Sequence, residues 1–163
     1  MRLFLGVRAK LYDYEKIKKS YYPYFRGKWV EEENLHATLY FFGEVEDKNK
    51  IIEKIKKISF PKKRVPLKGE GSFGQPPKIL FVNLQKNIYL QSYLKLEEIF
   101  GKTKKGFNPH VTILRIKKIL KKGYFDVINA SKKRELGYLK KEIILFQSRL
   151  TPNGPIYTPI YEF

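Results

Sequence analysis

The sequence predicts an α+β fold made of two similar halves around one shared cleft, in a single domain spanning residues 1–163. Length is the first reason, because 163 residues correspond to one domain of about 150 residues. An internal repeat is the second: the order strand, helix, strand, helix runs from Arg2 to Ile58 and again from Ile79 to about Lys133. No segment between the halves is long enough to separate them as independent domains.

The elements of the first half follow from apolar patterns bounded by turn residues. Aliphatic runs predict strands over residues 2–7 and 35–42. Asp13 is suited to cap a helix over residues 14–22, which Pro23 ends. Asp47 is suited to cap the next helix, which Pro61 closes. The isoleucines of that helix recur at helical spacing, at Ile51, Ile52, Ile55 and Ile58.

A turn-rich stretch at residues 69–77 precedes the second half. Strands are predicted over residues 79–84 and 109–116, and helices over residues 88–101 and 123–133. Two last strands, over residues 143–150 and 156–163, flank a turn at residues 152–155. Pro159 lacks a backbone donor, so the final strand is expected at a sheet edge.

Composition excludes several classes of protein. The chain has no cysteine, which rules out disulfides, thiolate metal sites and a cysteine nucleophile. Its 15% aromatic content argues against disorder. No apolar run approaches the roughly 18 residues of a membrane span, and the first ten residues do not form a signal peptide. We therefore expect a cytoplasmic protein.

The charge balance narrows the partners. Lys and Arg number 34 and Asp and Glu number 16, which gives a net charge of +18. Such a field attracts polyanions, and nucleic acid first among them. The alternative is a lysine-rich surface that only keeps the protein in solution.

The two histidines stand in the same motif. Leu35-His36-Ala37-Thr38-Leu39 and Pro109-His110-Val111-Thr112-Ile113 both contain H-x-T followed by an aliphatic residue. The chain has five threonines, so the chance of finding Thr two positions after both histidines is about one in a thousand. The motifs also stand at matching places, 32 positions after Phe4 and 29 positions after Phe81. The duplication predicts a functional pair.

The spacing predicts what the pair can do. Residues i and i+2 of a strand share a face, so His36 and Thr38 point the same way, as do His110 and Thr112. Two imidazoles and two hydroxyls in one cleft suit phosphoryl transfer without a metal, one imidazole taking a proton and the other giving one. The threonines are suited to hydrogen-bond phosphate oxygens. A zinc site would need further ligands, and no acidic residue stands at metal-like spacing.

These residues resemble the two-histidine phosphoesterases, and specifically the bacterial and archaeal RNA 2′,3′-cyclic phosphodiesterases once named 2′-5′ RNA ligases. The similar segments run nearly end to end: residues 2–7, Trp29-Val30, residues 33–39, Phe41-Phe42-Gly43, Gly71-Ser72-Phe73, residues 79–82, residues 107–113 with Arg115, Ser148-Arg149-Leu150, and Gly154-Pro155 with Tyr157. The loop before Ile79 departs from the family by holding little arginine, which weakens the expectation of substrate contacts there.

The resemblance implies two lobes with pseudo-two-fold symmetry, each an antiparallel sheet backed by helices, facing across a central cleft. It implies metal-independent hydrolysis of a terminal 2′,3′-cyclic phosphate on RNA to a 2′-phosphate, with no cofactor, and leaves reversible 2′-5′ RNA ligation open. It further implies that His36 is the acid and His110 the base, an order that the nearly symmetric motifs do not provide. A monomer is favoured.

Two further residues are candidates for substrate binding. Arg115 matches the family, but strand parity puts it on the face opposite His110 and Thr112, so it either reaches the phosphate around the strand end or is structural. Phe42 shares parity with His36, Thr38 and Tyr40, so it could stack on a base, although core packing is the more common role.

Two other functions stay open. One is a two-histidine phosphodiesterase acting on a small cyclic nucleotide. The other is a non-catalytic basic RNA-binding module. Loss of turnover without loss of RNA binding on histidine substitution would separate an enzyme from a binding module.

Overall fold

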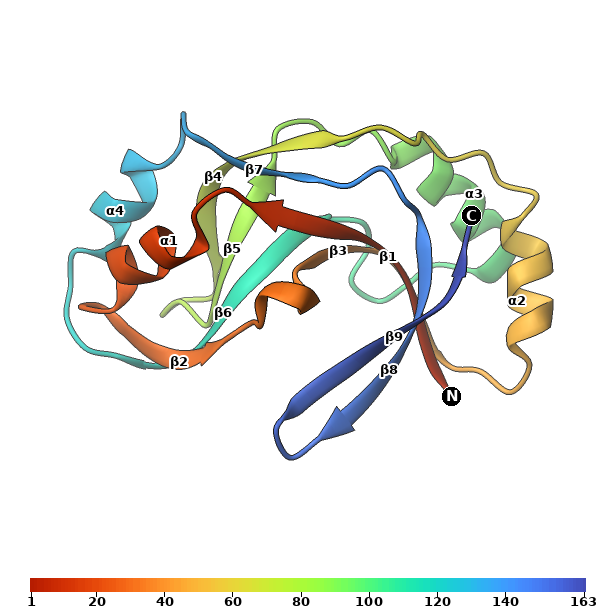
Figure 1. Ribbon diagram of the computed structural model, residues 1–163, viewed down its shortest axis with the longest axis horizontal. Coiled ribbons are helices and arrows are strands. Elements are labelled where there is room, and N and C mark those ends of the chain that lie inside the picture. Colours follow the sequence, from red (N-terminus) through yellow and green to blue (C-terminus); the bar gives the residue numbers. More distant parts are fainter.

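The computed structural model describes all residues 1–163 and confirms an α+β fold with antiparallel strands (Figure 1). The strands are β1 (Arg2–Leu11), β2 (Phe25–Trp29), β3 (His36–Glu44), β4 (Val65–Phe73), β5 (Ile79–Leu84), β6 (His110–Ile119), β7 (Glu135–Leu139), β8 (Ile144–Thr151) and β9 (Gly154–Glu162). The helices are α1 (Tyr14–Tyr21), α2 (Lys48–Ile55), α3 (Leu90–Phe100) and α4 (Tyr124–Ala130), with a 3-10 turn over Glu32–Asn34.

The sheets of the two halves are joined into one. The strand order is β2-β6-β5-β4-β7-β1-β8-β9, and β3 pairs with both β1 and β6. Six strands therefore close a ring, in the order β1, β3, β6, β5, β4 and β7. β3 and β6 meet at a single pair, Ala37 with Val111. The two histidine-bearing strands thus touch at one point, next to both histidines.

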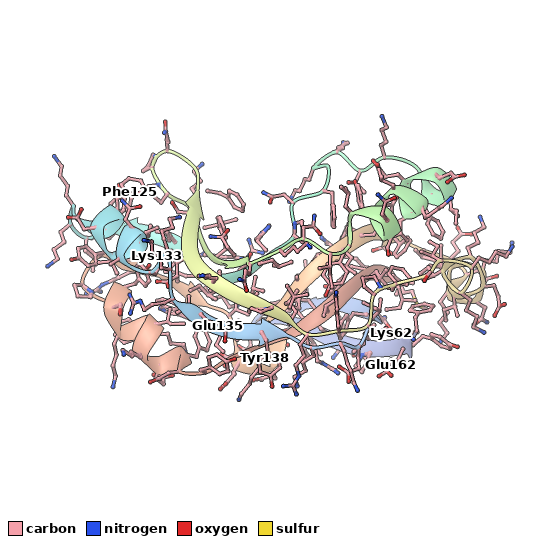
Figure 2. The ribbon with its side chains drawn as sticks, turned by 90° about the horizontal axis from the view of Figure 1, so that it is seen from above. Lys62, Phe125, Lys133, Glu135, Tyr138 and Glu162 are labelled. Atoms are coloured by element: carbon pink, nitrogen blue, oxygen red, sulfur yellow. The ribbon has the colours of Figure 1, made fainter.

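The helices lie at the two ends of the molecule (Figure 1). α1 and α4 cover one end, and α2 and α3 cover the other. The view with side chains places Phe125 of α4 near the first end, and Lys62 and Glu162 toward the second (Figure 2). Asp13 and Asp47 cap α1 and α2 as predicted, accepting hydrogen bonds from the backbone N–H of Lys16 and Asn49.

One hydrophobic core runs through both halves. It contains 30 buried residues, among them Leu5 and Leu39 from the first half and Val82 and Ile113 from the second. The helices do not meet the length and hydropathy of a membrane span.

Three strands, β2, β4 and β7, were not predicted, and each contains glycine. Glycine in a sequence argues against a strand, because it has no side chain to pack. It also allows the backbone of a neighbouring strand to come close. A Cβ on Gly27 would lie 2.1 Å from the carbonyl oxygen of Arg115, and one on Gly137 would lie 2.0 Å from that of Lys10. β4 occupies much of the stretch predicted to be turns, and Gly69 within it has a φ of +78°.

The remaining elements are close to the prediction. α4 ends at Ala130, earlier than the predicted helix over residues 123–133, and α3 begins at Leu90 and ends at Phe100. β9 ends the strand path, so the expectation of an edge strand containing Pro159 is confirmed.

Candidate active site

The contact between β3 and β6 brings the two motifs together. Ala37 of β3 pairs with Val111 of β6 in an antiparallel register. The adjacent positions then face each other across the strands, His36 with Thr112 and Thr38 with His110. Each histidine therefore has the threonine of the other motif as its cross-strand neighbour.

All four side chains lie on one face of the sheet. Ala37 and Val111 are completely buried, whereas His36, Thr38, His110 and Thr112 are only partly buried. This alternation is the one expected for strands with one face in the core. The four residues singled out from the sequence thus form one group.

A matching hydrogen bond fixes each imidazole. The Nδ1 of His36 lies 2.7 Å from the backbone oxygen of Asn34, and the Nδ1 of His110 lies 2.7 Å from that of Asn108. A carbonyl oxygen only accepts, so both Nδ1 atoms carry the hydrogen. Nε2 is then the free nitrogen of each ring, able to accept a proton when neutral and to donate one when charged.

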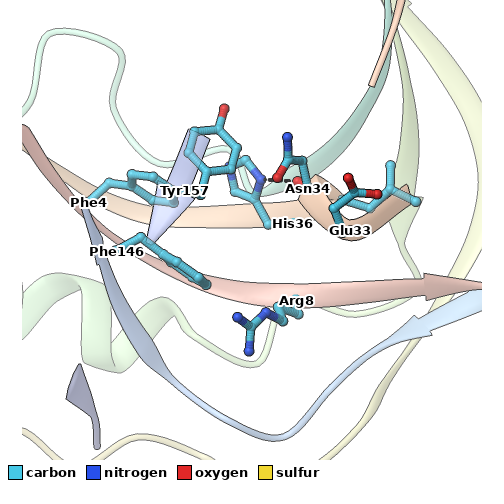
Figure 3. Close-up of a pocket in the computed structure, with 8 residues that line it drawn as sticks. Phe4, Arg8, Glu33, Asn34, His36, Phe146 and Tyr157 are labelled. Atoms are coloured by element: carbon cyan, nitrogen blue, oxygen red, sulfur yellow. Dashed lines mark hydrogen bonds between the residues drawn. The ribbon is translucent and has the colours of Figure 1, made fainter. Parts of the chain in front are cut away.

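Two aromatic rings pack against each imidazole, and Figure 3 shows the two beside His36, Phe4 and Tyr157. The His36 ring lies 5.0 Å from Phe4 and 5.0 Å from Tyr157, with Tyr157 edge-on at 79°. The His110 ring lies 5.2 Å from Phe81 and 4.9 Å from Phe73, with Phe73 edge-on at 80°.

This packing repeats the same arrangement in both halves and limits the motion of each ring. Phe4 and Tyr157 also line a small pocket beside His36. Its other lining residues are Arg8, Glu33, Asn34, Leu35 and Phe146.

The electrostatic environment favours neutral imidazoles. Burial lowers the pKa of His36, and the positive charges of His110 and Arg115 lower it further, against the opposing hydrogen bond to Asn34. Burial also lowers the pKa of His110, helped by Lys105 and opposed by the hydrogen bond to Asn108. A proton on His110 therefore makes protonation of His36 less favourable.

β-Bulges alter the faces of the strands beyond the motifs, and one of them directly follows each motif. In β3, Thr38 pairs with Gly6 and Tyr40 pairs with Leu5, which leaves Leu39 as an extra residue. In β6, Ile113 is extra in the same way, between the residues paired with Phe81 and Leu80. An extra residue reverses the alternation of the residues that follow it.

The prediction that Arg115 faces away from His110 and Thr112 is therefore wrong. Ile113 and Leu114 are both buried, and the exposed Arg115 returns to the face of the histidines. Its positive charge lowers the pKa of His36 on β3 and of Tyr157 on β9.

The parity argument for Phe42 is wrong as well, because Phe42 follows the bulge at Leu39 and is itself the extra residue of a second bulge, where Phe41 pairs with Phe4 and Gly43 pairs with Leu3. Tyr40 is buried and donates a hydrogen bond to the backbone oxygen of Gly101 at 2.6 Å, and Phe42 packs against the core. The Phe42 ring lies 4.8 Å from Tyr40 and 4.9 Å from Phe100. Phe41, with 43% of its surface exposed, takes the position that Arg115 has in the second half.

Sequence reasoning missed the aromatic residues around the histidines. Phe4 and Phe81 precede the two motifs by similar distances, which was a usable signal in the repeat. Phe73 and Tyr157 come from β4 and β9, where no repeated pattern marks them.

The described residues contain no group of three or more His, Cys, Asp or Glu side chains that could hold a metal ion. Two free Nε2 atoms, two hydroxyls and one guanidinium share the face instead. This set can bind an anion and move protons on either side of it.

Comparison with known proteins identifies relatives over nearly the whole chain. The model of the LigT-like phosphoesterase family matches residues 7–81 and 84–157. An RNA 2′,3′-cyclic phosphodiesterase of Methanocaldococcus jannaschii is 34% identical over 178 residues, covering 100% of both chains. One of Aquifex aeolicus is 34% identical over 166 residues, covering 91% of this chain and 87% of that protein.

Solved structures show the same fold. A Thermus thermophilus protein superposes with a TM-score of 0.70 at 25% identity, covering 100% of this chain and 97% of that one. Escherichia coli LigT in complex with 3′-AMP superposes with a TM-score of 0.76 at 21% identity, covering 99% and 96%.

Proposed function

The chain belongs to the LigT-like phosphoesterase family, and on that premise we propose that it is an RNA 2′,3′-cyclic phosphodiesterase. The reaction is hydrolysis of a terminal 2′,3′-cyclic phosphate to a 2′-phosphate without a metal. Relatives of that name match the chain at 30–34% identity over its full length or nearly so, which supports the substrate class.

The observation that carries the proposal is the repeated setting of the two imidazoles. Each Nδ1 is bound to a backbone oxygen two residues earlier, and each ring presents a free Nε2. The pair Ala37–Val111 holds the rings on one face with a threonine beside each. General acid and general base catalysis needs two such groups on opposite sides of the reacting phosphorus.

The reaction then follows with every proton accounted for. His110, neutral, accepts a proton from water as the water oxygen bonds to phosphorus. The bond between phosphorus and O3′ breaks, and His36, protonated, gives its proton to O3′. The products are a 2′-phosphate and a free 3′-hydroxyl, and the two histidines exchange protons with solvent before the next turnover. This order of roles is the one that the family resemblance implies.

The other polar groups of the face stabilise charge on the phosphate. Thr38 and Thr112 donate hydrogen bonds to its non-bridging oxygens, which gain negative charge as water attacks. Arg115 adds a full positive charge to the same face. Each of these groups stabilises the transition state more than the ground state, because the charge on the oxygens grows in the reaction.

The rest of the proposal concerns partners. The net charge of +18 supports RNA as substrate. A single chain supplies both histidines, so we propose that a monomer is active. The cytoplasm, where RNA ends are produced and processed, is the proposed place of action.

The test is to incubate an oligonucleotide ending in 2′,3′-cyclic phosphate with the protein and a metal chelator, and to identify the product. We expect a 2′-phosphate end. Turnover of mononucleotide cyclic phosphates alone would indicate a small-molecule enzyme, and RNA binding without turnover would indicate a binding module.

A further inference from the structure

The two halves of the site differ at the aromatic residue that stands edge-on to each histidine. Tyr157 lies 5.0 Å from His36 at 79°, and Phe73 lies 4.9 Å from His110 at 80°. The two ring pairs thus have nearly the same centroid distance and interplanar angle. The difference between the two is therefore the phenol hydroxyl, which only the His36 side has.

The hydroxyl of Tyr157 makes no hydrogen bond within the protein. The hydroxyls of three buried tyrosines do: Tyr14 bonds to Val30, Tyr21 to Glu70 and Tyr40 to Gly101. Burial raises the pKa of Tyr157, so the group keeps its hydrogen at neutral pH. It is a hydrogen-bond donor without a protein acceptor, and because it is not fully buried it is open to a ligand.

The surroundings of the hydroxyl are positively charged. Arg115 of β6 and Arg2 of β1 are the charged residues close enough to lower the pKa of Tyr157. Neither arginine forms an ion pair with a carboxylate. The side chain points its oxygen away from Phe146 and Arg8 (Figure 3). The hydroxyl belongs to a ring that packs on His36 and stands in a positively charged surrounding, so an anion is the acceptor that suits it.

We propose that the Tyr157 hydroxyl donates a hydrogen bond to a non-bridging oxygen of the phosphate that is bound between the histidines. This inference rests on the proposed function, and it adds a substrate contact from β9 to those from β3 and β6. Tyr157, Arg115 and His36 then approach the phosphate from three different strands.

The proposal adds to the asymmetry that Arg115, whose counterpart in the first motif is Phe41, already gives the site. Thr38, Thr112 and the two imidazoles are repeated in both halves, so they alone would bind a phosphate equally well in two orientations. One extra donor on the His36 side, where the second half has Phe73, favours one orientation over the other. The ester oxygen that leaves then faces the same histidine in each turnover.

The test compares Tyr157→Phe with wild type on a mononucleotide 2′,3′-cyclic phosphate. Tyr161→Phe, on the same strand with its ring 4.8 Å from Phe163, is the matched control. We expect Tyr157→Phe to lower kcat/KM by about tenfold, which is below the roughly hundredfold loss for a fully enclosed oxyanion donor. The melting temperature stays at the wild-type value, because the hydroxyl has no protein partner, and the control keeps full activity.

Two further measurements distinguish a lost phosphate contact from a lost ring and from failure of the proposed function. Tyr157→Leu also removes the ring, so full activity in Tyr157→Phe with loss only in Tyr157→Leu assigns the effect to the ring and overturns the proposal. Should wild type lack phosphodiesterase activity, the proposed function fails. In that case the phosphate contact is tested by the dissociation constant of inorganic phosphate, measured from the NMR signals of the histidines. An unchanged dissociation constant in Tyr157→Phe overturns the contact, and a several-fold increase supports it.

Discussion

Each imidazole of the proposed catalytic pair is positioned by atoms close to it in sequence. The acceptors of the two Nδ1 hydrogens are the backbone oxygens of Asn34 and Asn108, two residues before each histidine. The sequence therefore contained the reason for the tautomer, because the same local backbone precedes both motifs. The identity of the two histidines and two threonines could be predicted from the repeat alone, whereas their surroundings could not.

The lowered pKa values of the histidines predict an acidic optimum. The productive free enzyme has one neutral and one protonated imidazole, and this form is most abundant between the two macroscopic pKa values of the pair. Burial moves both below the ordinary value of 6.5. We expect kcat/KM on a mononucleotide cyclic phosphate to be bell-shaped with its maximum below pH 6.5. A maximum above pH 7, or a profile without an acid limb, would disagree with the buried imidazoles.

At the scale of elements, β-bulges decide which residues reach the site. Alternation along β3 and β6 predicts the faces of His36, Thr38, His110 and Thr112 correctly, and fails directly after them. The extra residues Leu39 and Ile113 are aliphatic like their neighbours, so nothing in the sequence marks them as bulges. The failure at Arg115 follows from the bulge at Ile113, and the failure at Phe42 follows from the bulge at Leu39 and a second one at Phe42 itself.

The bulge in β6 predicts a role for Arg115 in activity. Arg115→Met should lower kcat/KM by about tenfold or more, because it removes a charge from the histidine face. Lys117→Met, two residues further along the same strand, removes an equal charge from an exposed position and is the control. Equal effects of the two substitutions would assign the loss to net charge rather than to the position of Arg115.

Packing between β4, α1 and α4 includes a buried carboxyl group. Glu70 is 3% exposed, and its Oε1 accepts a hydrogen bond of 2.5 Å from the Tyr21 hydroxyl. Its backbone N–H donates to the Ser131 hydroxyl, and its backbone oxygen accepts from Lys132. Burial raises the pKa of Glu70 above its ordinary value of 4.5, against the hydrogen bonds and the charge of Arg134.

The raised pKa of Glu70 predicts how stability changes with pH. The folded state holds this proton more tightly than the unfolded state, so stability falls as pH rises from about 4.5 toward the folded pKa. Glu70→Gln keeps an oxygen for Tyr21 and removes the buried charge. We expect it to raise the free energy of unfolding at pH 7 by on the order of 1 kcal/mol, with no gain below about pH 4. Urea unfolding at both pH values measures this, with the exposed Glu46→Gln as control; destabilisation at pH 7 would count against it.

At the scale of the whole molecule, one sheet joins two halves that meet at the site. The repeated element order and the antiparallel α+β class could be predicted, since hydrophobic periodicity marks most elements. The closed ring of six strands could not, because two of its strands, β4 and β7, carry glycines that resemble strand breakers in the sequence. Close backbone approach at Gly27 and Gly137 becomes visible only once the strands are paired.

The basic surface and the site predict different responses to salt. The net charge of +18 binds a long RNA through many phosphates, and each such contact weakens as salt displaces it. A mononucleotide cyclic phosphate contacts only the site. Between about 50 and 200 mM salt we expect kcat/KM on a long RNA end to fall steeply, and kcat/KM on the mononucleotide to change little. Equal sensitivity of the two substrates would mean that the basic surface does not contribute to kcat/KM on the long RNA.

The most direct test of the account is whether the two histidines act as one unit. Turnover of an RNA 2′,3′-cyclic phosphate end is measured for His36→Ala, His110→Ala and the double variant, all checked for folding. Each single variant should lose at least about a hundredfold in kcat/KM. The double variant should be little slower than the slower single one, because one imidazole without the other cannot complete the proton transfers. Near wild-type turnover in either single variant, or losses that multiply in the double variant, would contradict a shared acid–base site at the junction of the two halves.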